Sequence, residues 1–332
     1  MKEKAIVLFS GGLDSALTSI ILKDAGLDVI ALRFVTPFGC IRKNEAKDVT
    51  GIIKEKFKIK VEEIILNEEF IEILKNPKYG YGKNMNPCID CKILMLKKAR
   101  KVMDEKKAVV VATGEVLGQR PMSQHKIALN NIENESGLKG YLLRPLSAKM
   151  FEQTIPEKAG IIDREKMYGI FGRGRKQQYE LAKKYGLDVI PQPASGCLLT
   201  DSYFSNRIKD LFKYKPDFNE RDVSFLRIGR HFRIGNEVKL ILGRNSSENA
   251  VLEKMYSSSD VMLSPGDDIP GPTGLVYGNN ISVNDISSSM SVFAKYSDKK
   301  IDSVKIDVKS SNKIDCLSAV PIDESAISRM KI

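Results

Sequence analysis

A glycine-rich loop near the N-terminus combines residue types that bind phosphate. Glycines let the backbone approach a phosphate closely, serines add hydroxyl donors, and a helix start offers unpaired N–H groups. The aspartate in this loop would repel phosphate unless a Mg²⁺ ion lay between them. We interpret the loop as a phosphate site, rather than a plain turn, made of Ser10, Gly11, Gly12, Asp14 and Ser15.

Three cysteines form a second candidate site. Cys88 and Cys91 lie three residues apart where a loop enters a predicted helix, and Cys197 ends a distant Ser-Gly-Cys segment. This spacing lets two thiolates reach one metal ion. The helix dipole and the neighbouring Lys92 predict a lowered pKa for Cys91, which would make it a better ligand or nucleophile.

Alternating strands and helices must position both sites. The sequence predicts strands at residues 5–9, 29–35, 61–66 and 108–113, and helices at 15–25, 44–57, 90–106 and near 176–185. This order is typical of an α/β fold with a parallel sheet covered on both faces. In such sheets ligands bind beyond the carboxyl ends of the strands, at a topological switch point. The proline-rich segment 190–197 breaks the periodicity, as an active-site loop or a domain edge would.

The sequence changes character after about residue 217. Short β-like runs at 225–228, 238–242, 274–277 and 303–308 are separated by Gly, Ser, Asn and Pro. We therefore expect two domains, a catalytic domain over 1–216 and an α+β module over 217–332.

The net charge of +11 indicates a polyanionic partner, although a lysine-rich composition alone would give the same value. No apolar run is long enough to span a membrane, and the first apolar run reads as a strand, so we expect a cytoplasmic protein. Five cysteines argue against a disulfide scaffold. We interpret Cys40 and Cys316, which have no partner motif, as free buried cysteines.

The loop of residues 10–15 resembles the pyrophosphate loop of the PP-loop ATP-pyrophosphatases, which have the adenine nucleotide α-hydrolase-like fold. The resemblance implies that ATP is split between its α and β phosphates and that an acceptor oxygen is adenylated. A nucleophile then displaces AMP.

The cysteine segments resemble those of tRNA thiolases. Asn86-Pro87 followed by Cys91 is similar to the 2-thiouridylases, although an acidic residue usually stands there in place of Cys88. Residues 195–197 resemble the loop carrying the second thiolase cysteine. The resemblance implies catalytic roles for Asp14, Cys91 and Cys197. Three cysteines in this arrangement also resemble those of the thiolases that hold a [4Fe-4S] cluster. The resemblance implies that Cys88, Cys91 and Cys197 are the cluster ligands. A persulfide relay between Cys91 and Cys197, or a structural zinc, stays open.

The segment of residues 112–124 resembles the 4-thiouridine synthases, and Arg144-Pro145-Leu146 is similar to a matching piece of that family. The resemblance implies a nucleotide and acceptor pocket that includes Gly114, Gln119 and Gln124.

Residues from about 220 to 320 resemble the NFACT-R domain, an RNA-associated module. The resemblance makes Arg230, His231, Arg233 and Arg244 candidates for tRNA contacts, unless the arginines instead pin turns to buried carboxylates. The basic run at 164–184 adds Arg173, Arg175 and Lys176 as candidate phosphate contacts. The alternative is that this run only forms a solvated helical face.

These resemblances imply an ATP- and Mg²⁺-dependent tRNA sulfurtransferase. It would adenylate a uridine carbonyl and replace its oxygen with sulfur from inorganic sulfide or a persulfide carrier, with 4-thiouridine favoured over 2-thiouridine. Because the phosphate loop begins at residue 10, we expect the second module, rather than a preceding THUMP domain, to capture tRNA. The alternatives are a PP-loop ligase or sulfur transferase acting on a small molecule, and a non-catalytic ATP-responsive RNA-binding factor.

Overall fold

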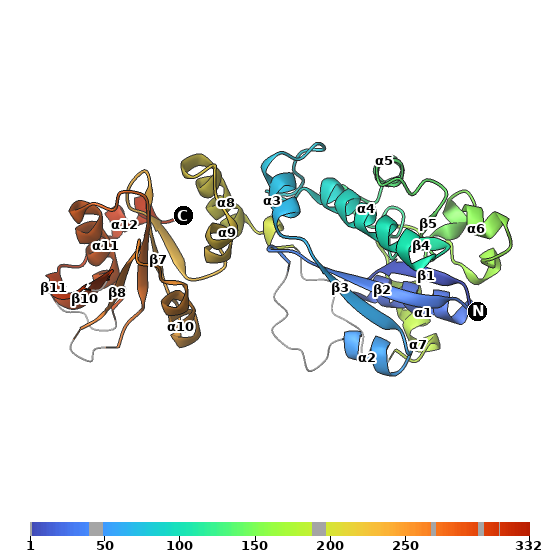
Figure 1. Cartoon of the computed structure of the whole chain (residues 1–332), viewed down its shortest axis with the longest axis horizontal. Helices are drawn as coiled ribbons and strands as arrows, with labels where there is room; N and C mark the ends of the chain where they lie inside the picture. Colours follow the sequence, from blue (N-terminus) through green and yellow to red (C-terminus); the bar gives the residue numbers. More distant parts are fainter. Residues whose placement is uncertain (1, 40–48, 188–196, 267–269, 298–301, 312) are drawn as a thin grey trace. The chain divides into compact units, whose positions relative to one another are not determined.

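The chain divides into two units, Met1–Asp201 and Ser202–Ile332. The computed structural model (Figure 1) describes residues 2–39, 49–187, 197–266, 270–297, 302–311 and 313–332. Cys40 and residues 195 and 196 lie outside the described residues. None of the described helices is both long and apolar enough to cross a membrane.

The first unit is built on a five-stranded sheet in the order β3-β2-β1-β4-β5, and all four neighbouring pairs are parallel. Its strands are β1 (Lys4–Leu8), β2 (Asp28–Val35), β3 (Lys60–Ile65), β4 (Val110–Thr113) and β5 (Leu142–Leu143). The predicted parallel α/β fold is confirmed.

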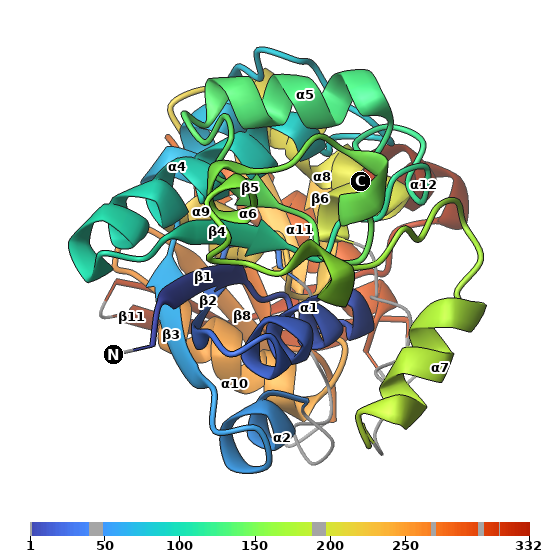
Figure 2. The ribbon, with the colours of Figure 1, turned by 90° about the vertical axis from the view of Figure 1, so that its right-hand side faces the viewer.

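Helices cover both faces of this sheet (Figures 1 and 2). Side chains alternate across β1, so that Ala5 and Val7 join one apolar core and Ile6 and Leu8 the other. The first core is closed by α1 (Leu13–Asp24), α2 (Val49–Glu55) and α7 (Lys176–Lys184), and the second by α4 (Cys88–Lys106) and α5 (Lys126–Glu135). The remaining helices of this unit are short and lie in connections: α3 (Glu68–Lys75), α6 (Ile155–Lys158), η2 (Ala148–Met150), η3 (Arg164–Lys166) and η4 (Leu198–Thr200).

The switch point of the sheet lies at the carboxyl end of β1. The chain runs outward from β1 to β2 and β3, then returns to pair β4 with the other side of β1. The loops that follow β1 and β4 therefore meet at one edge, where nucleotides bind in such folds. The glycine-rich loop and the 114–124 segment are these two loops.

The second unit is a six-stranded antiparallel sheet in the order β11-β10-β8-β9-β7-β6. One face packs on α11 (Val283–Lys295) and α12 (Glu324–Met330), and the other on α9 (Glu220–Phe225) and α10 (Ser246–Met255). The strands are β6 (Arg230–Arg233), β7 (Val238–Leu242), β8 (Val261–Pro265), β9 (Gly274–Gly278), β10 (Val304–Ser310) and β11 (Lys313–Ala319). The predicted α+β module is confirmed.

The strand predicted at 225–228 is wrong, because Phe225 ends α9. Asn219 and Asp222 form a capping box that starts this helix. The division between the units also precedes α8 (Ser202–Tyr214), whereas the sequence predicted it after residue 216. The reason is local, since Arg207 of α8 donates hydrogen bonds to the carbonyls of Leu226 and Gly229.

Candidate functional site

Hydrogen bonds made by two serine side chains stabilise the glycine-rich loop. Ser15 Oγ donates to the Gly12 carbonyl at 2.9 Å and lies 3.2 Å from Ser10 Oγ, while Gly11 has a φ of 68°. Gly12 caps α1 without a side-chain acceptor, unlike the side-chain caps of α9 and α11. The N-terminus of α1 therefore keeps its positive end open to a phosphate oxygen.

Asp14 lies in the first turn of α1 with its carboxylate buried. Within the described residues, its Oδ1 atom has no hydrogen-bond partner. Burial raises the pKa of the Asp14 carboxyl, and the charges of Arg175 and Arg120 oppose this shift, as do the amides of Gln119 and Gln178. An orphaned buried carboxylate oxygen fits a cation that the protein binds together with phosphate.

Three glutamine side chains add further unpaired polar atoms. Gln178 of α7 is fully buried, and in the described part of the chain neither of its amide atoms has a partner. The Gln119 Nε2 and Gln124 Oε1 atoms are also buried and have no hydrogen-bond partner among the described residues. Because Gln119 and Gln178 both act on the Asp14 carboxylate and lower its pKa, their amides and this carboxylate form one polar cluster at the start of α1.

Gly114 brings the end of β4 against the phosphate loop. A Cβ atom there would lie 2.6 Å from the Asp14 carbonyl carbon and 2.7 Å from the Ser15 nitrogen. The loop beyond it closes on itself, because Gly118 N donates to the Gln124 carbonyl and Gln124 N to the Arg120 carbonyl. Gly114 therefore allows close backbone packing against the glycine-rich loop.

Glu115 ties this edge to the helix that carries two of the cysteines. Its buried carboxylate accepts a hydrogen bond from Thr113 Oγ1 at 2.9 Å. It also lies 3.5 Å from Arg144 Nε and 3.8 Å from the Nζ of Lys92 in the first turn of α4. The network fixes the start of α4 relative to the end of β4.

The three cysteines come together through backbone contacts. Met85 N donates to the Leu199 carbonyl at 3.1 Å, and Asn84 Nδ2 donates to the Thr200 carbonyl at 2.8 Å. These bonds hold η4, which follows Cys197, against the loop before Cys88. All three cysteines are half-buried as whole residues, and Cys91 interacts electrostatically with the other two.

The buried Asp90 shapes the loop before the cysteines. Its two carboxylate oxygens accept hydrogen bonds from the backbone nitrogens of Lys78 and Tyr79 at 3.0 and 3.1 Å. A carboxylate occupied by two amides in this way is a structural clamp. Asp90 lies between Cys88 and Cys91, so the clamp also orients the cysteine turn.

The predicted lowering of the Cys91 pKa is wrong. Burial, reinforced by Cys88, raises the pKa of Cys91 to about 12. Lys92 opposes this shift only in part, and its ammonium group lies 3.8 Å from the Glu115 carboxylate. Sequence spacing could not reveal the burial of the thiol, which is the larger effect.

The donor set fits an iron–sulfur cluster by its chemistry. Soft thiolates suit iron–sulfur clusters, and three of them leave one iron open. Within the described ranges, no three His, Cys, Asp or Glu side chains are yet close enough together to hold one metal ion. The three thiols therefore lie near one another but do not form a preorganised metal site.

The basic residues predicted to bind RNA in the first unit separate into two groups. Arg173 and Lys176 are exposed, so their predicted phosphate contacts stay open. Arg175 is half-buried and its charge acts on the Asp14 carboxylate of the glycine-rich loop. Gln178, Arg120 and Glu115 were not predicted as site residues, although Arg120 and Glu115 lie within the quoted 112–124 motif.

Intramolecular contacts engage the candidates in the second unit. His231 is buried and its Nε2 atom bonds the Ile228 carbonyl, so a direct RNA contact by its ring is excluded. Arg233 binds Asp210 through two nitrogens, and its guanidinium stacks 4.3 Å from the Tyr214 ring centroid. The alternative that arginines pin turns therefore holds for Arg233. Arg244 is paired with Glu248 while remaining half-exposed.

Arg230 keeps its guanidinium over the Tyr296 ring, 5.1 Å from its centroid. It is only partly buried, so this stacking leaves its predicted RNA contact open.

Comparisons with known proteins agree with this division of the chain. Residues 1–165 match the family described as thiamine biosynthesis protein (ThiI), and residues 229–329 match the NFACT protein RNA binding domain. A tRNA-specific 2-thiouridylase MnmA of Thermoanaerobacter pseudethanolicus is 27% identical over 333 residues, covering 91% of this chain and 86% of the relative. A second one, of Caldanaerobacter subterraneus, is also 27% identical with the same coverage.

Two solved structures share parts of this architecture. A 4-thiouridine synthetase in complex with RNA and ATP is 22% identical with a TM-score of 0.40, and the match covers 68% of this chain and 51% of that one. The U34-tRNA thiolase NcsA of Methanococcus maripaludis, with its [4Fe-4S] cluster, is 18% identical with a TM-score of 0.34, covering 67% of this chain and 69% of that one. The chain thus spans about half the length of the 4-thiouridine synthetase.

Residues 1–165 are thus similar to the ThiI family, residues 229–329 are similar to the NFACT RNA binding domain, and most of the chain is similar to tRNA-specific 2-thiouridylases. Together with the phosphate loop at the switch point, these similarities relate the chain to the PP-loop tRNA thiolases.

Proposed function

We propose that this protein is an ATP-dependent tRNA sulfurtransferase, and that its product is 4-thiouridine rather than 2-thiouridine. The observation that carries the proposal is the convergence at one edge of the sheet. The phosphate loop and the 114–124 loop meet at Gly114, and Lys92 and Glu115 join this edge to the cysteine helix. A site for ATP therefore lies next to a site for sulfur.

The reaction that this arrangement suits has two displacements. The uridine carbonyl oxygen attacks the α-phosphorus of ATP, and pyrophosphate leaves with the bridging electron pair. A sulfur nucleophile then attacks the activated ring carbon, and AMP leaves with the former carbonyl oxygen. Splitting the substitution in this way replaces a poor leaving group by a good one.

The first displacement needs positive charge where negative charge develops on the leaving pyrophosphate. The open N-terminus of α1 and the guanidinium groups of Arg175 and Arg120, whose charges act on the Asp14 carboxylate, would supply it. Asp14 would hold Mg²⁺ through its unpaired Oδ1 atom. Gln119 and Gln178 would orient the phosphates through their unpaired amides.

Cys88, Cys91 and Cys197 would hold a [4Fe-4S] cluster, which would supply an open iron coordination position for sulfur. The protein contributes the position of these thiols. The hydrogen bonds donated by Met85 N and Asn84 Nδ2 set the distance between the two cysteine segments, and the Asp90 clamp sets the turn between Cys88 and Cys91.

The test is a complete reaction with purified protein, ATP, Mg²⁺, unmodified tRNA and inorganic sulfide under anaerobic conditions. Digested tRNA is compared with 4-thiouridine and 2-thiouridine standards by mass spectrometry and chromatography. We expect 4-thiouridine together with one pyrophosphate per modified base. Pyrophosphate release with a small molecule but not with tRNA would indicate a small-molecule ligase, and tRNA binding without pyrophosphate release would indicate a non-catalytic factor.

A further inference from the structure

An exposed phenylalanine from a distant segment lies on the loop that follows β4. The backbone of Phe171 forms an isolated parallel bridge with Leu117, and Gly172 N donates to the Leu117 carbonyl at 2.8 Å. A Cβ atom on Gly118 would lie 3.1 Å from the Phe171 ring, so the ring lies directly on the backbone of this loop. Phe171 belongs to neither of the two family matches, which cover residues 1–165 and 229–329.

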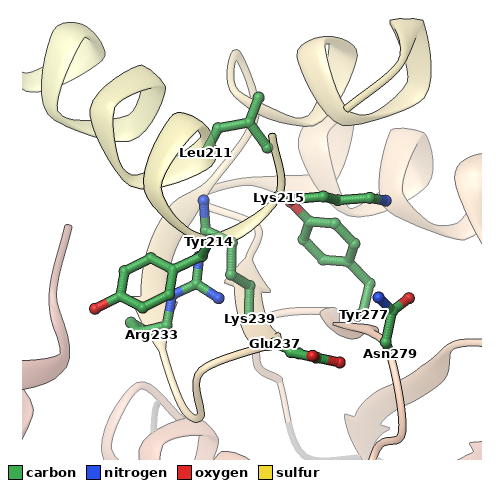
Figure 3. Close-up of a pocket in the computed structure, with 9 residues that line it drawn as sticks. Leu211, Tyr214, Lys215, Arg233, Glu237, Lys239, Tyr277 and Asn279 are labelled. Carbon is green, nitrogen blue, oxygen red and sulfur yellow. The ribbon is translucent and has the colours of Figure 1, made fainter. Parts of the chain in front are cut away.

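The Phe171 ring offers uncovered apolar surface. It is 64% exposed, whereas the preceding Ile170 is buried and hydrogen-bonded through its backbone. Within the described part of the chain, no other ring stacks on Phe171 and no cation lies over it. The Tyr214 ring in the second unit differs, because Arg233 lies 4.3 Å from its centroid (Figure 3) and Lys213 lies 4.8 Å from it. The backbone thus fixes Phe171 while its ring stays free for a ligand.

The Phe171 ring lies next to the proposed nucleotide site. The residue after Gly118 is Gln119, whose side chain acts on the Asp14 carboxylate. Arg175 follows Phe171 by four residues, and its charge acts on the same carboxylate. Both segments that meet at the ring therefore lead to Asp14. The ring itself is on the surface, outside the buried polar cluster at the start of α1.

The charge around the ring favours an anionic partner. Arg120 follows Gly118 by two residues, Arg173 follows Phe171 by two residues, and both arginines are exposed. Among the described residues, neither guanidinium forms an ion pair. A purely apolar partner would leave both cations without a counter-charge. A nucleotide strand satisfies both features, because its bases stack on aromatic rings and its phosphates bind arginine.

The proposed reaction creates a need for such a ring. Enzymes that do chemistry on a base act on single-stranded substrate or take the base out of its stack. The nucleotide beside an extracted uridine loses a stacking partner, and an aromatic side chain can replace it. Because Phe171 lies outside the buried cluster around Asp14, its position suits this neighbouring nucleotide rather than the reacting uridine.

We infer that the Phe171 ring stacks on an unpaired RNA nucleotide that flanks the target uridine, while Arg173 binds a phosphate of the same strand. The inference rests on the proposed action on tRNA, and it assigns the first unit an RNA contact of its own. Every base has a flat face, so this stacking contributes affinity and position rather than sequence selection.

The experiment measures binding of unmodified tRNA to the full-length protein by fluorescence anisotropy. A non-hydrolysable ATP analogue is present throughout. Phe171→Leu keeps an apolar side chain but removes the ring, and should weaken tRNA binding at least about fivefold, the effect of one lost base stack. Phe171→Tyr and Phe171→Trp keep a ring and should bind tRNA within about twofold of the parent protein.

Ile155→Ala is the matched control, because it also shortens an exposed apolar side chain. Ile155 N donates to the Gly140 carbonyl just before β5 begins, so it lies at the edge of the parallel sheet opposite the phosphate loop. This variant should leave tRNA binding unchanged. The exposure of Phe171 predicts that Phe171→Leu keeps the parent Tm and the parent affinity for the ATP analogue. A lower Tm with unchanged tRNA binding would overturn the inference.

The salt dependence of tRNA binding separates stacking from phosphate contact. Phe171→Leu should weaken binding equally at every salt concentration, whereas Arg173→Ala should lower the salt slope by about one. Equal tRNA affinity of Phe171→Leu and the parent protein would overturn the inference. Weakening by Phe171→Trp as large as that by Phe171→Leu would overturn it as well, since a ring would then be of no use.

Thiouridine formation is scored separately on the same proteins. Normal thiouridine formation with tRNA affinity unaffected by Phe171→Leu would reject the stacking contact alone. Weakened tRNA binding in Phe171→Leu and retained binding in Phe171→Trp, without any thiouridine product from the parent protein, would reject the proposed reaction. The RNA contact of Phe171 would then still stand.

Discussion

Gly114 and Asp14 are in backbone contact across the edge of the sheet. A Cβ atom on Gly114 would lie 2.6 Å from the Asp14 carbonyl carbon, closer than real Cβ contacts come. The atoms in the way belong to the backbone at the start of α1, so they cannot rotate aside as a flexible side chain can. The phosphate loop and the loop after β4 therefore move as one body.

Gly114→Ala should displace the phosphate loop and weaken ATP binding at least tenfold. Overpacking of this kind typically costs about 1–3 kcal/mol, so the Tm should fall as well. Calorimetric titration with a non-hydrolysable ATP analogue measures the change in nucleotide affinity. Gly51→Ala is the control, because nothing lies within 4 Å of a Cβ there and α2 should gain slightly in stability. Equal ATP affinity in both variants would refute the contact.

Asp14→Asn should abolish tRNA-dependent pyrophosphate release while tRNA binding stays nearly intact. The substitution keeps the size of the side chain but removes the charge that a bridging Mg²⁺ needs. Because burial raises the pKa of Asp14, the carboxylate is destabilised in the empty protein, and the variant should unfold at the same or a higher temperature. Asp104→Asn, on an exposed turn of α4, should change neither property. Pyrophosphate release at the parent rate would refute the adenylation role.

Anaerobically purified protein should contain about four irons per chain if the cluster is cubane. Cys88→Ala, Cys91→Ala and Cys197→Ala should each remove the colour and the iron. Cys316→Ala is the matched control. The expectation that Cys316 is buried is wrong, because it lies exposed on β11 in the other unit. A colourless parent protein that thiolates tRNA from a persulfide donor would instead favour a relay. In that case Cys88→Ala should be the mildest of the three variants.

The salt dependence of tRNA binding separates phosphate contacts from structural arginines. Arg173→Ala and Lys176→Ala remove exposed cations, so each should lower the salt slope by about one without changing the Tm. Arg233→Ala leaves Asp210 with only one of its two cations and should cost on the order of 2 kcal/mol of stability. An unchanged Tm for Arg233→Ala with a lower slope would show that Arg233 contacts RNA directly.

Strong periodicity made the first unit predictable. The strand–loop–helix order around residues 10–15 and the alternation of apolar runs specify a parallel sheet, and the sheet order then places the two loops together. The strand prediction at 225–228 failed because a short run with three apolar residues fits a helix end as well as a strand. The Asn219–Asp222 capping box was the signal that could have corrected it.

The parts of the site that the sequence did not reveal depend on burial and on distant pairing. Gln178 lies in a basic helical stretch that reads as a solvated face, yet its side chain is fully buried at the nucleotide site. The high pKa of Cys91 and the burial of His231 likewise result from packing against other segments of the chain. A motif gives the residue types at a site, whereas desolvation is set by segments far away in the chain.

The buried His231 makes the stability of the second unit depend on pH. Burial, together with the nearby cations Arg207 and Lys239, lowers the pKa of His231 well below its usual value of 6.5. His231 is therefore protonated near pH 6.5 in the unfolded chain but stays neutral at this pH in the folded unit. Stability is complete above about pH 6.5 and is lost as the pH falls below it, by about 1.4 kcal/mol per unit.

Urea unfolding between about pH 7.5 and 5.5 measures this loss. His231→Gln cannot be protonated, and its amide can still donate to the Ile228 carbonyl that the ring contacts at 2.8 Å. The variant should therefore lose less stability than the parent protein over this range, even if it starts from a lower value. The only other histidine, His125, caps α5 through its Nδ1 atom. His125→Asn preserves a side-chain cap and should keep the full pH dependence of the second unit. A pH profile of His231→Gln parallel to that of the parent would show that another group controls acid unfolding.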